Sequence, residues 1–194
     1  RLVKMGYHDI NEKIKPHSFY AFFLEDVDEM ASRNECVEVK SVRYNTESTN
    51  REQATLLTLF EYMIGNSDWA IPIYRNVKLM RSKDDNFSKP FVVPYDFDYS
   101  GLVNARYAVP PPDLPISSVQ ERFYLGFSRT MGELQLALQI IRNQRQKIDS
   151  LIMNLGPLDI YYKREMIEYL NEFFKITEKE NDIKKIFITN ARKE

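Results

Sequence analysis

Residues 99–118 are the feature that most constrains the fold of this chain. They contain Gly101, little hydrophobic periodicity, and four prolines: Pro110, Pro111, Pro112 and Pro115. This composition predicts an irregular segment that is too long to be a simple connector. The patterns before it are mostly short and strand-like, and those after it are long and helical, without the regular alternation of a parallel nucleotide-binding sheet. The chain is therefore predicted to be an α+β protein.

The part of the chain before residue 99 predicts two pairs of strands and one well-defined helix. Residues 2–7 and 18–24 are rich in aromatic and aliphatic side chains and predict a hairpin. The helix is expected over residues 51–64, where apolar side chains recur at helical spacing and Gly65 supplies a stop. The other elements expected here are a helix at 27–33, a strand at 36–42, and a second hairpin from strands 75–80 and 90–95.

The part after residue 118 predicts helices throughout, at 119–127, 130–154, 158–174 and 178–190. Gly156 and Pro157 mark a clean break between the two longest. Between the two halves, the prolines of residues 99–118 fix φ and remove backbone donors, so we expect an ordered, extended, polyproline-like stretch.

Composition limits the classes of partner. Apolar residues make up 43% of the chain, which predicts a packed core, and the net charge of −1 gives no global field that would attract nucleic acid. The basic run Arg142, Arg145 and Lys147 is expected to be a solvated face, so no nucleic-acid partner is predicted. No apolar run is long enough to predict a membrane-spanning segment. Single Cys36 excludes an internal disulfide, and the compartment is left open.

Four polar residues stand at the ends of predicted elements before residue 99. Asp68 lies in the loop after the helix at 51–64, Asn76 at the start of one strand, and Asp96 and Asp98 after the partner strand. A hairpin brings the start of one strand close to the end of the other. Phosphoryl transfer needs an Asp that orients a hydroxyl group, together with oxygen ligands that hold Mg²⁺ against the phosphates. The order and spacing of these residues therefore favour a phosphoryl-transfer site.

The motifs Gly65-Asn66-x-Asp68, then Asn76, then Pro94-x-Asp96-Phe97-Asp98 resemble the atypical kinases of the CotH and HipA-like type. The run from about Tyr20 to Phe127 looks most like uncharacterised CotH-related proteins common in Bacteroidetes. The resemblance implies a protein-kinase-like fold, mostly the helical C-lobe. Residues 1–26 would be a remnant of the N-lobe sheet with the hinge, and residues 27–194 the C-lobe. Within that lobe would lie a catalytic loop at 65–76, a metal motif at 96–98 and an activation-like segment at 99–118.

The resemblance also implies roles for individual residues. Asp68 would be the catalytic Asp, and Asn76, Asp96 and Asp98 would hold Mg²⁺. Glu25 and Asp26, near the hinge, and Lys78 would contribute to ATP binding. The phosphoryl acceptor would be a protein or a small molecule of unknown identity, and the rim of its preformed site would lie near Asn104, Arg106 and Tyr107 in the activation-like segment. Two departures are plain: Asn76 lies eight positions after Asp68, more than the usual kinase loop allows, and Asp98 stands where ordinary kinases have Gly.

Other readings of these residues stay open. No Gly-rich phosphate loop and no convincing nucleotide-anchoring Lys precede Tyr20, so we expect that most of the N-lobe is missing from this chain. A catalytically silent kinase-like domain that binds a nucleotide or a partner is one alternative to an active kinase. A metal-dependent phosphohydrolase is another, because Asp96-Phe97-Asp98 at a strand end also suits a phosphatase. Taken alone, Asp68 could also serve as a turn residue.

Overall fold

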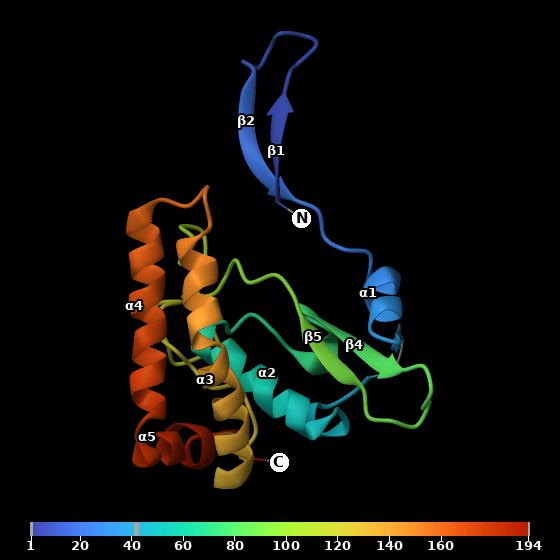
Figure 1. Ribbon diagram of the computed structural model, residues 1–194, viewed down its shortest axis with the longest axis vertical. Helices are drawn as coiled ribbons and strands as arrows, with labels where there is room; N and C mark the ends of the chain where they lie inside the picture. Colours follow the sequence, from blue (N-terminus) through green and yellow to red (C-terminus); the bar gives the residue numbers. More distant parts are fainter. Residues whose placement is uncertain (1, 41–42, 194) are drawn as a thin grey trace.

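The first element pair is a hairpin that projects from the rest of the molecule. The computed structural model describes residues 2–40 and 43–193. Strand β1 (Leu2–Tyr7) pairs antiparallel with β2 (His17–Phe22), from Leu2 opposite Phe22 to Tyr7 opposite His17. The Asp9 carboxylate accepts the backbone N–H groups of Asn11, Lys13 and Ile14 and so orders the connecting turn. Figure 1 shows the hairpin extending well away from the helices, joined to them by residues 23–26.

A small sheet and a short helix follow. Helix α1 (Val27–Arg33) leads into β3 (Cys36–Glu38), which pairs with β4 (Val77–Ser82). Strand β4 pairs in turn with β5 (Phe91–Pro94), and the antiparallel sheet has the order β3-β4-β5. The buried side chains of β4 and β5, among them Val77, Leu79 and Val92, face helix α2 (Arg51–Ile64) and give the sheet its apolar side.

Four α-helices form the remainder of the regular structure in the described residues. They are α2 (Arg51–Ile64), α3 (Met131–Met153), α4 (Ile160–Thr177) and α5 (Glu180–Lys184), the last continuing as a π-helical turn at Lys185–Thr189. Short 3₁₀ turns lie at Thr46–Ser48 and Ile71–Ile73. Asn50 caps the start of α2 through the N–H of Gln53, and Thr130 with Glu133 forms a capping box at α3.

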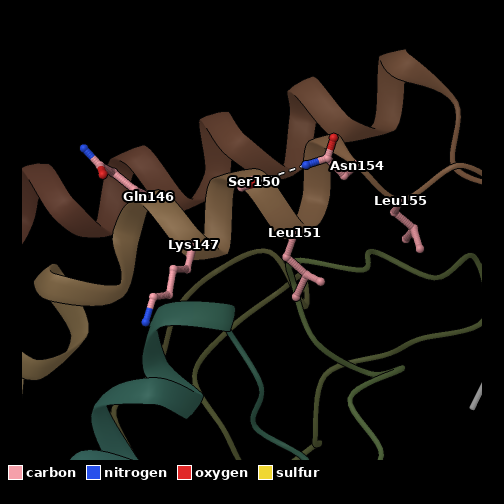
Figure 2. A pocket seen from close by; sticks show the side chains of 6 residues that line it. All are labelled: Gln146, Lys147, Ser150, Leu151, Asn154 and Leu155. Atoms are coloured by element: carbon pink, nitrogen blue, oxygen red, sulfur yellow. Dashed lines mark hydrogen bonds between the residues drawn. The ribbon is translucent and has the colours of Figure 1, made fainter.

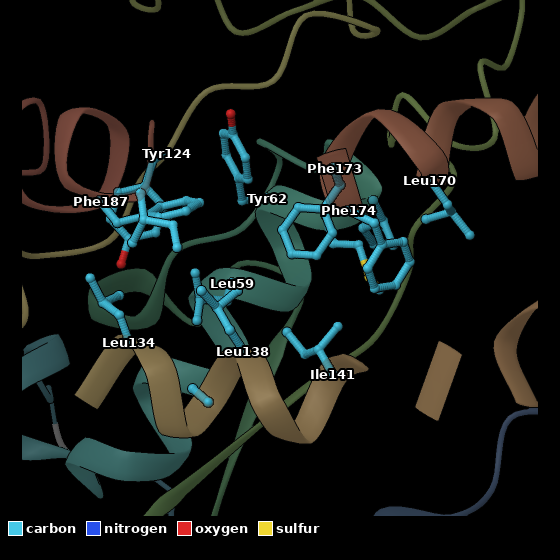
Figure 3. Close-up of a cluster of buried hydrophobic side chains, with 14 of the residues drawn as sticks. Leu59, Tyr62, Tyr124, Leu134, Leu138, Ile141, Leu170, Phe173, Phe174 and Phe187 are labelled. Carbon is cyan, nitrogen blue, oxygen red and sulfur yellow. The ribbon is translucent and has the colours of Figure 1, made fainter. Parts of the chain in front are cut away.

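The helices enclose the largest apolar cluster (Figure 3). Residues of α2, α3 and α4 meet there with the π-helical turn, and Tyr62, Tyr124 and Phe187 pack edge to face. A second cluster joins Leu57 of α2 to β4, β5 and the loop that carries Trp69. A third, smaller cluster lies between α1 and β3. All three draw their members from residues 27 onward, so the buried core lies in the body below the β1–β2 hairpin.

Most element predictions are confirmed and two are wrong. The α+β class and the helix at 51–64 are confirmed, and the predicted strands are shifted or shortened by a few residues. The strand expected at 36–42 is described only as far as Glu38, and residues 41 and 42 lie outside the described part of the chain. The extended stretch expected within 99–118 is instead a succession of turns, closed by hydrogen bonds such as Leu114 N to Pro111 O.

The helix expected at 119–127 is also wrong: this segment has no helical residue. Its successive side chains enter different cores, since Tyr124 packs in the helical cluster and Leu125 in the cluster beside β4. Neighbouring residues that point in opposite directions suit an extended chain and not a helix. Arg122 fixes the segment by donating to the backbone oxygens of Met63 and Tyr169, and its guanidinium stacks on the Tyr169 ring. The segment therefore fills the gap between α2 and α4.

Two expectations about surfaces can be compared with the structure. The basic run on α3 is not simply solvated: Arg142 donates to the backbone oxygen of Thr177, and Arg145 donates to Asn171 and covers the Phe174 ring. These arginines tie α3 to α4. Among residues 2–40 and 43–193, no helix combines the length and the apolar character needed to span a membrane.

Candidate functional site

The loop that carries Asp68 is fixed by the way α2 ends. Gly65 adopts the left-handed conformation, with φ of 67°, and its N–H donates to Tyr62 O. The N–H of Asn66 donates to Glu61 O over 2.8 Å, so the turn satisfies backbone oxygens at the end of the helix. The side chain of Asn66 then accepts the N–H of Asp68 at 3.0 Å. These two successive turns thus fix the position of the Asp68 backbone relative to the end of α2.

Asp68 and Asn76 meet directly, despite their separation in sequence. Asn76 Nδ2 lies 3.0 Å from Asp68 Oδ2 and 2.7 Å from the backbone oxygen of Asp68. The intervening loop is pinched by a bridge in which Ala70 and Arg75 exchange both backbone hydrogen bonds at 3.0 Å. Residues 71–74 are therefore a closed excursion, and they absorb the extra length of the loop.

Asp96 is brought to the same end of the β4–β5 hairpin. The last strand pair is Val77 with Pro94, and Tyr95 then donates its N–H to Asn76 O at 3.0 Å. Asn76 and Asp96 both have positive φ, 52° and 60°, a conformation that side chains other than glycine rarely adopt. Strained backbone of this kind is concentrated at functional sites. Tyr74, in the loop between Asp68 and Asn76, has the same conformation, with φ of 54°.

The acidic groups of this cluster influence one another. Burial raises the pKa of the Asp96 carboxyl, and the hydrogen-bonded, negatively charged Asp98 and the charge of Asp68 raise it further. Such mutual repulsion is relieved when a cation shares the carboxylates. The Asn76 amide gives its nitrogen to Asp68, which leaves its oxygen as the atom that it can offer to a cation. The donor set of amide and carboxylate oxygens suits Mg²⁺.

Whether these residues suit Mg²⁺ depends on the Asn76 amide oxygen. Among the described residues, no three His, Cys, Asp or Glu side chains are grouped so that they could hold a metal ion by themselves. Asp96 and Asp98 therefore form a candidate donor set only together with Asn76. In addition, Arg75 lies beside the catalytic candidate, with Nη1 3.6 Å from Asp68 Oδ1.

The segment after the acidic motif returns to it. The Tyr107 hydroxyl donates to Asp98 Oδ2 at 3.0 Å, and this bond, with the Asp98 charge, raises the pKa of Tyr107. Gly101 N donates to Gly65 O, so the start of the segment is joined to the end of α2. Gly101 to Asn104 also line a cavity of about 510 Å³ whose opposite wall comes from α4. Of the three rim residues expected from sequence, Tyr107 contacts the acidic motif and Asn104 lines this cavity.

Three residues predicted to bind the nucleotide have local partners. Asp26 caps α1 by accepting the N–H groups of Asp28 and Glu29, and Glu25 pairs with Arg33 at 2.6 Å. Lys78 Nζ lies 3.3 Å from Glu38 Oε1, in a pair that Lys40 joins from the other side. Glu25 and Asp26 lie in the link between β2 and α1.

A separate hollow lies along the C-terminal half of α3. It has a volume of about 560 Å³ and lies near the start of the α3–α4 connection, where Ser150 and Asn154 are hydrogen bonded (Figure 2). Its lining includes Lys147 but no carboxylate, and none of the predicted site residues. We therefore place the candidate site at the end of the β4–β5 hairpin, where the acidic and amide side chains are grouped, and not at the hollow along α3.

Two residues support the site in ways that sequence reasoning did not predict: Glu61, which it did not single out, and Asn66, which it named in a motif without a role of its own. Both are buried, with exposed fractions of 1% and 2%. Glu61 stands four residues after Leu57 and three before Ile64, both of which are buried on α2. A Glu in an apolar helical stripe is itself a signal, because a charged group is rarely buried without a role or a partner.

Searches of protein-family models, of curated proteins and of solved structures found no match to this chain.

Proposed function

We propose that this chain carries the catalytic and metal-binding part of a kinase-like domain that transfers a phosphoryl group from ATP with Mg²⁺. One observation carries the proposal: Asp68, Asn76 and Asp96 converge at one end of the β4–β5 hairpin, through the Asn76 hydrogen bond to Asp68 and the backbone hydrogen bond from Tyr95 N, next to Asp96, to Asn76 O. In this proposal Asp68 orients and deprotonates the acceptor hydroxyl group. Asn76 and Asp96, with Asp98, provide oxygen ligands.

The order of elements gives separate support. Apart from strand β3 and the short 3₁₀ turns, a hairpin is followed by a link, a short helix, the longer α2, a loop with Asp, a second hairpin, an acidic motif, an irregular segment and then helices. The protein-kinase C-lobe, which the sequence resembles, has the same order from its hinge to its activation segment. The pinched loop at residues 71–74 removes one of the two departures noted in the sequence, because the extra residues do not separate Asp68 from Asn76.

The protein's own residues have distinct tasks in this proposal. The oxygens of Asn76 and Asp96 would hold Mg²⁺, which offsets charge on the ATP phosphates. Asp68 is held from one side by Asn76, so its carboxylate has a fixed direction for the acceptor hydroxyl. Tyr107 fixes Asp98 and joins the motif to the segment where the acceptor would lie. The acceptor is a protein or a small molecule that carries a hydroxyl group.

A silent kinase-like domain is the second candidate, and one observation favours it. Both carboxylate oxygens of Asp68 have a partner, Asn76 at Oδ2 and the Arg75 guanidinium at Oδ1. A substrate hydroxyl group would have to compete with these two partners for the carboxylate oxygens. In this second proposal the domain binds a nucleotide at the Asn76 and Asp96 oxygens without transferring its phosphate.

Two variants and one control separate the candidates. We expect Asp96→Ala to abolish Mg²⁺-dependent ATP binding measured by calorimetry, because it removes ligand oxygens without emptying the core. Asp68→Asn should keep binding and lose turnover, measured as phosphate release or transfer. Asp113→Ala is the matched control, an exposed Asp in the neighbouring segment.

The outcomes are distinct. ATP binding without turnover in the wild-type protein would establish the silent domain. Wild-type affinity for ATP in Asp96→Ala, with Mg²⁺ present, would contradict both candidates.

A further inference from the structure

A buried carboxyl group lies directly behind the candidate catalytic loop. Glu61 is in the last turn of α2 and only 1% exposed. Within the described part of the chain, neither of its carboxylate oxygens has a hydrogen bond of ordinary geometry. The amide nitrogen of Asn66 is also buried and has none. Unpaired polar groups of this kind are rare in folded proteins and call for an explanation.

The two unpaired groups face each other. Asn66 Oδ1 accepts the N–H of Asp68, and a backbone N–H can only donate, so the orientation of the Asn66 amide is fixed. Its Nδ2 must therefore point to the other side, and there it needs an acceptor. Asn66 acts on Glu61 by lowering the pKa of its carboxyl, which places the two side chains next to each other. The unpaired Asn66 amide is a donor, and the unpaired Glu61 carboxyl can accept from it.

Burial decides the protonation state of Glu61. It raises the pKa of the carboxyl to about 8, because the effect of burial exceeds the opposite effect of Asn66, which lowers the pKa. The charged side chains that pack against α2 are engaged elsewhere: Arg122 with Met63 O, Tyr169 O and Glu172, and Arg129 with Thr55 and Glu47. At neutral pH the group is therefore a carboxylic acid, which can both accept and donate a hydrogen bond.

We propose that Glu61 is a positioning residue whose uncharged carboxyl group holds Asn66, so that Asn66 holds the turn that presents Asp68. The proposed hydrogen bond would run from Asn66 Nδ2 to the Glu61 carboxyl, both buried and otherwise unpaired, and the observed one runs from Asp68 N to Asn66 Oδ1 at 3.0 Å. A second link is the backbone bond from Asn66 N to Glu61 O. The role of this relay in catalysis rests on the proposed function, whereas its role in ordering the loop does not.

The test uses Glu61→Leu and Glu61→Gln in the full chain. Leu removes the acceptor and puts an apolar side chain of similar size in its place. Gln retains a neutral acceptor. Hydrogen exchange measured by NMR should show the Asn66 side-chain amide and the Asp68 backbone amide exchanging about fivefold faster in Glu61→Leu, which corresponds to one lost hydrogen bond. Glu61→Gln should exchange as the wild type does. Amides in the centre of α3 should be unchanged in both variants and thus exclude global destabilisation.

A kinetic readout then connects the relay to Asp68. If the wild type transfers phosphate, Glu61→Leu should lower kcat while leaving KM for ATP with Mg²⁺ unchanged, because the cation ligands lie on the hairpin and not on this turn. Unchanged protection of the Asn66 and Asp68 amides in Glu61→Leu would overturn the inference. Absence of turnover in the wild type would count against the proposed function alone, because the exchange measurement still decides the role of Glu61.

Discussion

The β1–β2 and β4–β5 hairpins of this protein share antiparallel pairing but differ in how far their side chains are buried. In β1–β2, no residue of either strand is buried, and Phe19, Tyr20 and Phe22 are exposed. In β4–β5, Val77 and Val92 are completely buried, and the Gln53 side chain of α2 pairs with the backbone N–H and oxygen of Val92. Strand pairing alone therefore does not make a rigid platform. Packing against α2 does so for β4–β5, and the candidate site lies on that hairpin.

Replacing one leucine in each hairpin should give the largest difference in the loss of unfolding free energy. Leu79 in β4 is 1% exposed and Leu2 in β1 is 48% exposed. We expect Leu79→Ala to lower the free energy of unfolding by about 2–5 kcal/mol, because it leaves a cavity between the sheet and α2. Leu2→Ala should change it by no more than about 0.5 kcal/mol. Urea denaturation followed by circular dichroism measures both, and equal losses would contradict the contrast.

A pair of glycines tests the same contrast at the backbone. Gly65 has a φ of 67°, and a Cβ there would lie 1.9 Å from the Tyr169 hydroxyl, whereas a Cβ on Gly6 meets nothing within 4 Å. The Tyr169 hydroxyl is held by its bond to Gln120 O, so it has little freedom to move away. We expect Gly65→Ala to cost about 2–4 kcal/mol of unfolding free energy and Gly6→Ala to be near neutral. Thermal unfolding of both variants provides the check, and a stable Gly65→Ala protein would show that the loop tolerates another path.

The pH dependence of stability should reveal the buried carboxyl behind the site. The pKa of Glu61 is about 8 in the folded protein against 4.5 for the free side chain, so the folded state keeps a proton that the unfolded chain releases. Stability should consequently fall as the pH rises from 4.5 to 8, by at most about 1.4 kcal/mol per pH unit. Glu61→Gln should remove this contribution.

The difference between wild type and Glu61→Gln isolates this one group from the others that titrate. Glu133, for example, has a pKa lowered to about 2, chiefly by its hydrogen bond to Arg51, and acts in the opposite direction below pH 4.5. Denaturation curves at several pH values between 5 and 8 give the two slopes. Parallel slopes in the two proteins would mean that Glu61 is not buried as an acid.

The sequence predicted those elements whose local signals and tertiary environment agree. Helix α2 was predicted over its full range because the apolar spacing and Gly65 point to the same boundaries. The segment 119–127 was misread because its apolar residues serve two different cores, which no periodicity reveals. The turns of residues 99–118 likewise depend on contacts with distant parts of the chain, such as Gly101 with Gly65.

The candidate site was predicted in part for the same reason. Asp68, Asn76 and Asp96 stand at element ends, where turn chemistry and functional chemistry use the same residue types, and their order carried the prediction. Their mutual distances depend on the pinched loop between Ala70 and Arg75, which the sequence does not reveal. Glu25, Asp26 and Lys78 have structural partners, and their predicted contact with a nucleotide stays a prediction.

The central claim, that the end of the β4–β5 hairpin binds a divalent cation, can be tested most directly with Mn²⁺ as a paramagnetic probe. NMR spectra of the full chain should be recorded during titration with Mn²⁺, first alone and then with ATP, with Mg²⁺ as the diamagnetic reference. The account predicts selective broadening of the signals of Asn76, Asp96 and Asp98, reversal by excess Mg²⁺, and unchanged signals from β1–β2. Broadening that is centred elsewhere, or none at these residues with ATP present, would contradict it.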